Sequence, residues 1–275
     1  MIINHNMSAM NANRNVNINS TSASKSMQKL SSGLRINNAA DDAAGLAISE
    51  KMRGQIRGLD QGSRNAQDGI SLIQTAEGAL NETTSILQRM RELSVQSATA
   101  TNTTADRAAI STEFTQMKSE ITRIGTQTEF NTKALIGGAF SGAAAALKFQ
   151  IGPNASQTID LNIKTMTATG LVITALVLVN TATNAQIATT ALDKALASVS
   201  TERANLGSVQ NRLEHTINNL NTSSENLQTS ESRIRDVDMA KEMSEFSKNN
   251  ILSQAAQAML AQANQQPQQI LQLLR

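Results

Sequence analysis

Residues 192–234 read LDKALASVSTERANLGSVQNRLEHTINNLNTSSENLQTSESRI, and this stretch decides the fold. An apolar residue stands at every seventh position, and these residues are Leu192, Val199, Leu206, Leu213, Leu220, Leu227 and Ile234. A seven-residue repeat keeps one narrow apolar stripe on the same side of an α-helix. The repeat therefore predicts one long helix that packs lengthwise against another helix.

A second repeat of the same kind lies in the first half of the chain. It comprises Leu59, Ala66, Ile73, Leu80 and Leu87. A helix from Leu59 to Ser97 would be about 58 Å long, given the rise per residue of an α-helix. Residues 99–104 interrupt the pattern. Thr103 and Asp106 then have the spacing of a capping box, which predicts that a further helix begins there.

The middle of the chain, residues 131–183, is richer in glycine and poor in charge. Two runs alternate apolar and polar residues on either side of the turn GPNAS at 152–156. Their apolar members are Leu147, Phe149 and Ile151, and then Ile159, Leu161 and Ile163. This alternation predicts a β-hairpin with one apolar face. The apolar run 171–179 is compatible with either a buried strand or a short buried helix.

The two ends of the chain differ from these helices. Residues 1–40 are rich in Asn, Ser and Met, and they are too poor in apolar residues to bury much surface, so we expect disorder in an isolated subunit. At the other end, Pro267 within the polar stretch 265–269 is expected to interrupt a helix. The apolar residues expected to serve packing or assembly there are Leu252, Met259, Leu260, Ile270 and Leu274. A terminus this apolar indicates a partner surface.

Together these patterns predict a mainly α protein, a long antiparallel helical bundle or coiled coil with a small β-hairpin region in the middle of the chain. The stripes of the two long helices can cover each other. The ends carry too little core to fold alone. The simplest physical solution is that copies of the chain bury each other's ends.

Composition argues against several other classes of protein. The formal charge is +2 without a basic cluster, which does not favour nucleic-acid binding. The apolar run 171–179 is too short to span a bilayer, which needs about 20 residues, and residues 1–19 lack the apolar core of a Sec-type signal peptide. There is no cysteine, and His5 and His215 have no ligand spacing, so we predict no metal site and no cofactor. No catalytic grouping is present, so we predict no enzyme.

Several motifs resemble the terminal regions of bacterial flagellins. They are LSSGLRIN at 30–37, AADDAAGLAIS at 39–49, LQRMRELSVQS at 87–97, QTEFN at 127–131, LEHTINNL at 213–220, ESRIRD at 231–236, ILSQAA at 251–256 and QANQQP at 262–267. The resemblance covers residues 1–135 and 185–275, on both sides of the middle. Several long motifs in the same order make it specific.

The resemblance implies a minimal flagellin that contains the inner domains only. Residues 1–40 and 236–275 would form the inner helical domain that lines the filament channel. Residues 41–135 and 185–235 would form the helical rod domain. Residues 136–184 would be a short central hairpin and loop region, with the outer domains absent.

The resemblance also implies a function, as a structural subunit that polymerises into the extracellular flagellar filament for swimming motility. Such subunits are secreted by the flagellar type III route without a cleaved signal. The implied partners are copies of the chain, an export chaperone at the C-terminal helix, and the filament cap and hook-associated proteins. Two alternatives remain, a hook–filament junction protein and a secreted helical adhesin. Abundance in sheared surface material and the motility of a null mutant discriminate among the three.

Arg89, Leu93 and Glu113 match the positions through which the vertebrate Toll-like receptor that senses flagellins binds them. From the residues alone, Arg89 and Glu113 are charges on helices and Leu93 is expected at the edge of a stripe. That pattern indicates a solvated face or a contact between subunits. The resemblance implies receptor binding by the free subunit, with much of this surface hidden in a filament.

Overall fold

The structure is a computed structural model that describes residues 6–142, 145–176 and 182–273, with side chains of the last range described from 183 to 266. Its elements are α1 (Met7–Ser32), α2 (Ala43–Ala98), α3 (Thr104–Gln127), β1 (Glu129–Phe130), β2 (Lys133–Ala134), β3 (Leu147–Gln150), β4 (Thr158–Leu161), α4 (Ala182–Arg235) and α5 (Met239–Leu273). The predicted mainly α fold with a hairpin region in mid-chain is confirmed. The chain divides into two compact units. We call residues 55–224 the central unit, and residues 1–54 with 225–275 the terminal unit.

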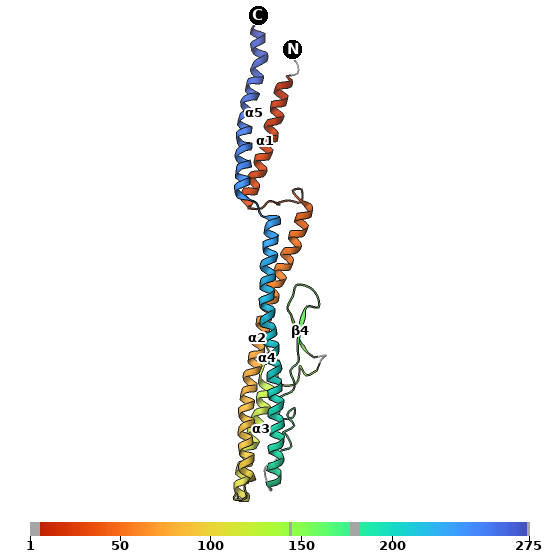
Figure 1. The fold of residues 1–275 in the computed structure, drawn as a ribbon, viewed down its shortest axis with the longest axis vertical. Helices are drawn as coiled ribbons and strands as arrows, with labels where there is room; N and C mark the ends of the chain where they lie inside the picture. Colours follow the sequence, from red (N-terminus) through yellow and green to blue (C-terminus); the bar gives the residue numbers. More distant parts are fainter. Residues whose placement is uncertain (1–5, 143–144, 177–181, 274–275) are drawn as a thin grey trace. The chain divides into compact units, whose positions relative to one another are not determined.

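In the central unit the two long helices α2 and α4 run side by side, with α3 packed beside them (Figure 1). The two helices are antiparallel, because residues with lower numbers on α2 contact residues with higher numbers on α4. Ser94 bonds the carbonyl oxygen of Ala185, whereas Asp60 bonds Ser224. The core between the helices is made of aliphatic side chains around Phe114. The two heptad stripes therefore cover each other within the chain.

A capping box begins α3, as the sequence predicts. The Thr103 hydroxyl oxygen accepts from the Asp106 N–H at 3.3 Å, and the Asp106 carboxylate accepts from the Thr103 N–H at 2.9 Å. The Thr103 hydroxyl, and then the Thr103 N–H, donate to the Asp106 carboxylate and hold the pKa of Asp106 below its ordinary value. The first turn of α3 thus satisfies its free N–H groups locally.

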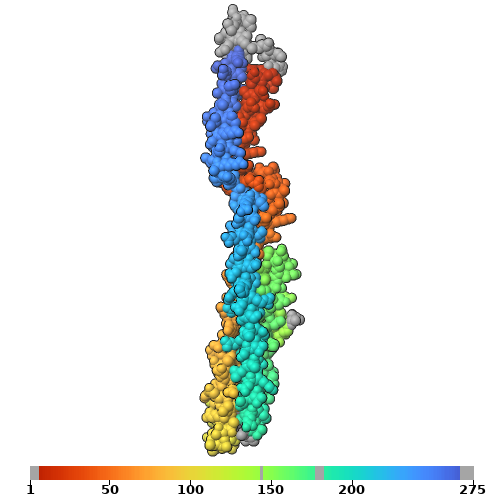
Figure 2. All heavy atoms as spheres, in the orientation of Figure 1, coloured from red at the N-terminus to blue at the C-terminus, as the bar shows by residue number. Residues whose placement is uncertain are grey.

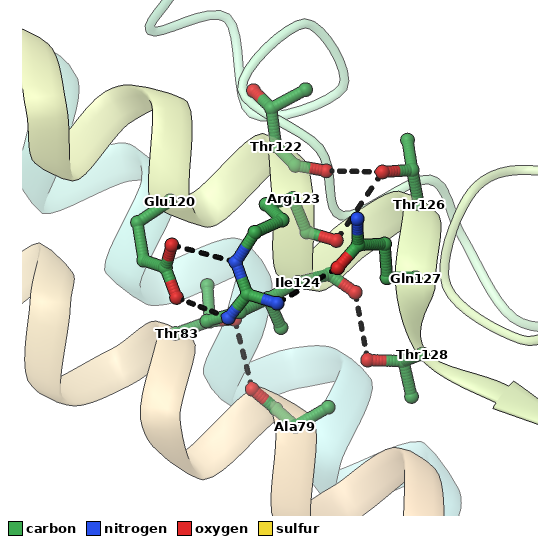
Figure 3. Close-up of polar contacts among 9 residues, drawn as sticks. All are labelled: Ala79, Thr83, Glu120, Thr122, Arg123, Ile124, Thr126, Gln127 and Thr128. Atoms are coloured by element: carbon green, nitrogen blue, oxygen red, sulfur yellow. Dashed lines mark hydrogen bonds and ion pairs between the residues drawn. The ribbon is translucent and has the colours of Figure 1, made fainter.

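The end of α3 is fixed by side chains of its last turn (Figure 3). Thr128 donates from both its N–H and its hydroxyl to the Ile124 carbonyl, at 3.0 and 2.7 Å. Arg123 donates from Nε to Glu120 and from Nη1 to Gln127, each at 2.8 Å. The Arg123 guanidinium lowers the pKa of the Glu120 carboxyl. Such exposed pairs within a helix contribute only about 0.3–0.5 kcal/mol, so the cap determines where α3 stops.

The hairpin predicted in mid-chain is formed by β3 and β4. They pair antiparallel with Leu147 opposite Leu161 and Phe149 opposite Ile159. Ile159 and Leu161 are buried, while Thr158 and Asp160 face solvent. The alternation in the sequence therefore marks the apolar face correctly.

A second, smaller hairpin between β1 and β2 was not predicted. Phe130 pairs with Lys133 across Asn131 and Thr132, whose φ angles are 49° and 63°. Two successive positive φ angles are typical of a two-residue hairpin turn, a position that favours Asn. Asn131 is the one sequence signal for this turn, and the strands are only two residues long.

The tip of the β3–β4 hairpin lies directly on the backbone of α2. A Cβ atom at Gly62 would come within 2.5 Å of the Ile151 carbonyl oxygen, and one at Gly58 within 2.5 Å of Pro153 Cβ. The two glycines are four residues apart and so share one face of the helix. Figure 2 shows the hairpin region, in green, also lying along the flank of α4. The missing side chains on α2 are what allow this close approach.

The apolar run that begins at Leu171 is neither strand nor helix over its described part, residues 171–176. Leu171 and Ile173 are buried, whereas Val172 between them is exposed and has a φ of 58°. The Ile173 N–H bonds the Ala168 carbonyl at 3.0 Å, as at the C-terminal end of a helix. The segment is therefore a tight turn that buries alternate residues.

Lys118 of α3 holds the end of this turn. Its Nζ donates to the carbonyl oxygens of Thr174 at 2.8 Å and Leu176 at 3.4 Å. A side chain thus satisfies backbone groups that a strand or helix would have paired with its own neighbours. Residues 177–179, the remainder of the apolar run, lie outside the described residues.

In the terminal unit α1 and α5 lie side by side and antiparallel (Figure 1). Asn6 contacts Ala263, while Leu34 forms a bridge with Asp236 at the other end of the pair. The predicted interruption at 265–269 is wrong, because α5 continues as one helix through Pro267. The proline removes a single hydrogen bond from the helix, and the carbonyl that it leaves free has another donor, Asn6.

Substituting Gly62 with Ala should lower the free energy of unfolding by about 1–3 kcal/mol, because the new methyl group meets the hairpin backbone. Gly78→Ala is the matched control in the same helix, since no atom lies within 4 Å of its Cβ position. That substitution should raise stability by about 0.5–1 kcal/mol through helix propensity. Urea unfolding measures both variants. Equal effects of the two substitutions would contradict the contact between the hairpin and α2.

Candidate assembly surfaces

Most of the residues predicted to pack along the heptad stripes are buried within the chain itself. Those exposed by less than a tenth are Leu59, Ile73, Leu80, Leu87, Leu192, Val199, Leu206, Leu213 and Leu220. All belong to the central unit. They form the seam between α2 and α4 and do not offer a surface to another molecule.

The remaining predicted residues belong to the terminal unit, and those with described side chains are more exposed. Leu227, Ile234 and Leu260 are half-buried, Leu252 is 41% exposed and Met259 is 62% exposed. The side chains of Ile270 and Leu274 lie outside the described residues. The predicted set therefore divides into an internal seam and an apolar surface that the chain only partly covers.

Polar pairs across the seam fix the register of α2 against α4. The Arg91 guanidinium contacts Asp193 at 2.7 Å, and further along the helices Arg203 contacts Glu77 at 3.5 Å. Ser94 donates to the Ala185 carbonyl at 2.7 Å from a fully buried position. A shift of one helix by a turn would leave these groups unpaired, and an unpaired buried hydroxyl costs roughly 1–3 kcal/mol.

The terminal helices expose large apolar side chains. In α1, Met7 is 68% exposed and Met10 is 61% exposed, and Ser26 is the one buried residue of this helix. In α5, Ile251 is 65% exposed, in addition to Met259. Each of these helices covers one side of the other and leaves several large apolar side chains exposed among polar ones. Exposed apolar surface of this extent is typical of a contact with a further molecule.

Backbone and ionic contacts join the end of α4 to the loop that precedes α2. The Arg35 N–H donates to the Arg235 carbonyl at 2.7 Å. The Arg235 guanidinium in turn donates to Glu50 on α2 at 2.8 Å. This bond lowers the pKa of Glu50, with a smaller contribution from Arg53. With 16% of its side chain exposed, Arg235 is more buried than Arg35 or Arg53.

Arg89, a predicted receptor contact, is the centre of an exposed ionic cluster. Its Nη1 contacts Glu92 at 3.0 Å, and its Nε and Nη2 donate to the same oxygen of Glu113 at 3.2 and 3.1 Å. These two carboxylates, Glu92 first, raise the pKa of the guanidinium. The cluster joins α2 to α3, and about half of each side chain of the Arg89–Glu113 pair faces solvent.

Leu93, in contrast, is buried, although the sequence placed it at the edge of a stripe. It is 1% exposed. A heptad stripe accounts for one partner helix, whereas α2 packs against both α3 and α4, so the buried face of α2 is wider than one stripe. Arg89 and Glu113 therefore present side chains to solvent, whereas the side chain of Leu93 is buried.

Other kinds of site find little support in the described part of the chain. No group of three or more His, Cys, Asp or Glu side chains able to hold a metal ion occurs among those residues. The adjacent carboxylates of Asp41 and Asp42 accept hydrogen bonds from backbone N–H groups. Asp42 accepts from the Gly45 N–H and Asp41 from the N–H groups of Asn37 and Asn38. None of the described helices is long and apolar enough to cross a membrane.

A central unit with a complete internal seam, and terminal helices that expose large apolar side chains, define a helical protein of the kind that assembles through its ends. Comparison with known families gives its identity. Residues 3–141 match the bacterial flagellin N-terminal helical region, and residues 189–274 match the bacterial flagellin C-terminal helical region. The chain belongs to the bacterial flagellin family.

Individual relatives agree with this assignment. The chain is 60% identical over 277 residues to the flagellin of Halalkalibacterium halodurans, covering 100% of both chains. It is 50% identical over 286 residues to the flagellar filament 33 kDa core protein of Treponema phagedenis, again with 100% of both covered. A solved structure assigned as a flagellar hook-associated protein of Vibrio parahaemolyticus has a TM-score of 0.60, covering 71% of this chain and 100% of that one. At 15% identity it shows the same fold alone.

The contact between Glu50 and Arg235 predicts a dependence of stability on pH. Because the folded pKa of Glu50 lies below the ordinary value of 4.5, its stabilising effect is present above pH 4.5 and is lost as the pH falls through the lower, folded value. Glu50→Gln should therefore flatten the acid side of the curve of unfolding free energy against pH. Urea unfolding at a series of pH values from neutral to about pH 3 measures this curve.

The matched control is Glu82→Gln, which removes the same charge from an exposed site on α2. For Glu82→Gln, the unfolding free energy should still fall with pH on the acid side as steeply as in the wild type. Identical curves for the wild type and Glu50→Gln would show that Arg235 does not stabilise this carboxylate.

Proposed function

We propose that this chain is the structural subunit of an extracellular flagellar filament that serves swimming motility. The observation that carries the proposal is the unequal burial of its two units. The stripe residues of the central unit are buried within the chain, while Met7, Met10, Ile251 and Met259 remain more than half exposed. Membership of the flagellin family, and a relative named as a flagellar filament core protein, support a homopolymer as the covering partner.

Polymerisation supplies the free energy that the terminal helices lack. Complete burial of an exposed Met or Ile contributes about 1.5–3 kcal/mol. Ordering each residue of a helix costs about 1–2 kcal/mol of backbone entropy. Helices that bury so little within one chain therefore depend on neighbouring copies. A contact between different faces of the subunit, repeated without closure, produces an open helical assembly.

The alternatives raised by the sequence are less well supported. A secreted adhesin or a hook–filament junction protein would share parts of this fold. The match to flagellins, however, runs over the full length of the chain at 60% and 50% identity. We propose that residues 1–40 and 236–275 line the filament channel, and that residues 41–135 and 185–235 form the surrounding rod.

The finer partners follow from the same surfaces. We propose that an export chaperone covers the apolar side of α5 before secretion, because exposed Ile251 and Met259 would otherwise aggregate. Cap and hook-associated proteins would contact the two ends of the filament. Flagellins are structural proteins, and we assign this chain no catalytic role and no cofactor.

Met259→Asp should raise at least about tenfold the free-subunit concentration at which polymerisation stops, because assembly would bury a charge in place of an apolar side chain. Urea unfolding of the dilute subunit should stay within about 0.5 kcal/mol of the wild type, since Met259 is already exposed there. Sedimentation of filaments, followed by measurement of the subunit left in solution, gives the concentration.

The matched control is Gln254→Asp, which adds the same charge at an exposed polar position of α5. It should polymerise much as the wild type does. A truncated chain that lacks residues 251–275 should remain soluble and form no filaments. Normal polymerisation of either Met259→Asp or the truncation would overturn the proposal that α5 is an assembly surface.

We also propose that the free subunit binds the vertebrate Toll-like receptor that senses flagellins. The resemblance of Arg89, Leu93 and Glu113 to the family's receptor contacts supports this, as does the exposed pairing of Arg89 with Glu113. Buried Leu93 would contribute by supporting α2 from below. The receptor would bind the charged cluster on α2 and α3.

Arg89→Ala should weaken binding of the purified receptor ectodomain by at least about tenfold, as expected for a central interface arginine. Arg91→Ala is the control, since Arg91 is an equally exposed arginine on the same helix and pairs with Asp193 instead. Surface plasmon resonance with monomeric subunits measures both. Equal affinities of Arg89→Ala and the wild type would remove Arg89 from the receptor site.

A further inference from the structure

Pro267 leaves the carbonyl group of Ala263 without its helical partner. In an α-helix the N–H of each residue bonds the carbonyl four residues earlier, so a proline at 267 removes the donor to Ala263. Ala263 is 9% exposed, which leaves little room for water to replace that donor. A buried carbonyl without a partner is destabilising. The helix nevertheless continues on both sides of the proline.

Asn6, from the opposite end of the chain, supplies the missing donor. Its Nδ2 donates to the Ala263 carbonyl oxygen at 2.8 Å. Its Oδ1 accepts from the Ala9 N–H at 3.1 Å, which caps the first turn of α1. A backbone N–H can only donate and a carbonyl can only accept, so both bonds require the same orientation of the Asn6 amide. No residue type with an acceptor-only or donor-only side chain could make both.

We propose that Asn6 is a lock that couples the ordering of the two terminal helices. One side chain completes the N-terminus of α1 and the hydrogen bonding of α5 at Pro267. The last part of α5 therefore reaches its full hydrogen bonding only when the start of α1 has docked beside it. The proposal rests on the filament function, because we expect these helices to order when a subunit joins its neighbours.

The chemistry of the lock identifies the variants that test it. Asn6→Asp keeps an oxygen for the Ala9 N–H, and Asp is as good a helix cap as Asn. It removes the donor, however, and so leaves the Ala263 carbonyl without a partner in the Pro267 chain. Pro267→Ala restores the N–H within α5, so that Ala263 no longer depends on Asn6. Asn15→Asp adds the same charge at an exposed position of α1 and serves as the control.

The experiment is a double-mutant cycle on the full-length chain, read as the free-subunit concentration in equilibrium with filaments. Asn6→Asp should raise this concentration at least about fivefold, the ratio given by the loss of one average net hydrogen bond. In the Pro267→Ala background the same substitution should raise it less than about twofold. Asn15→Asp should stay close to the wild type in both backgrounds.

Each outcome decides between the lock and its alternatives. Complete failure of Asn6→Asp to polymerise, with filaments restored by adding Pro267→Ala, would support the lock. An equal effect of Asn6→Asp in both backgrounds, or failure of the double variant, would overturn it, because Asn6 would then act independently of Pro267. Failure of the wild-type chain itself to polymerise would instead refute the filament function.

Discussion

The narrow apolar seam between α2 and α4 is the constraint on which the rest of the structure depends. Leu80, Leu87, Leu192 and Leu206 are fully buried along it. A stripe this narrow tolerates sliding by one heptad, because one leucine would simply replace another. Polar pairs such as Ser94 with the Ala185 carbonyl remove that freedom, since a shifted register would leave them unpaired. Outside the seam, the glycines of α2 lack side chains, and this allows the hairpin to lie against the helix backbone.

The terminal unit differs from the central unit in how many elements cover its apolar side chains. In the central unit α3, the hairpin and the turn held by Lys118 add further apolar cover to the two long helices. In the terminal unit α1 and α5 have chiefly each other, and their outer sides keep Met10 and Met259 in solvent. A subunit built this way has a stable part that needs no partner and a part that copies of itself must complete. This division suits a protein that is exported before it assembles.

Much of this could be predicted from the sequence, where the signal was local or periodic. Heptad spacing, the capping box at Thr103 and the alternation around the hairpin depend on neighbouring residues, and each was predicted correctly. The misses depend on contacts between distant segments. Leu93 is buried although one stripe alone places it at an edge, and at Pro267 the carbonyl left free in α5 accepts from Asn6, 257 residues away. The turn after Leu171 likewise accepts a hydrogen bond from Lys118 of α3. Periodicity gives an element and its apolar face, and it does not show how many partners share that face.

The central claim is that neighbouring subunits complete the terminal helices. Amide hydrogen exchange, measured peptide by peptide on the dilute monomer and on the filament of the same full-length chain, tests it most directly. The account predicts rapid exchange across α1 and α5 in the monomer, strong protection of both in the filament, and protection of the α2–α4 seam in either state. Equal protection of α1 and α5 in monomer and filament would contradict it, because the ends would then be complete within a single chain.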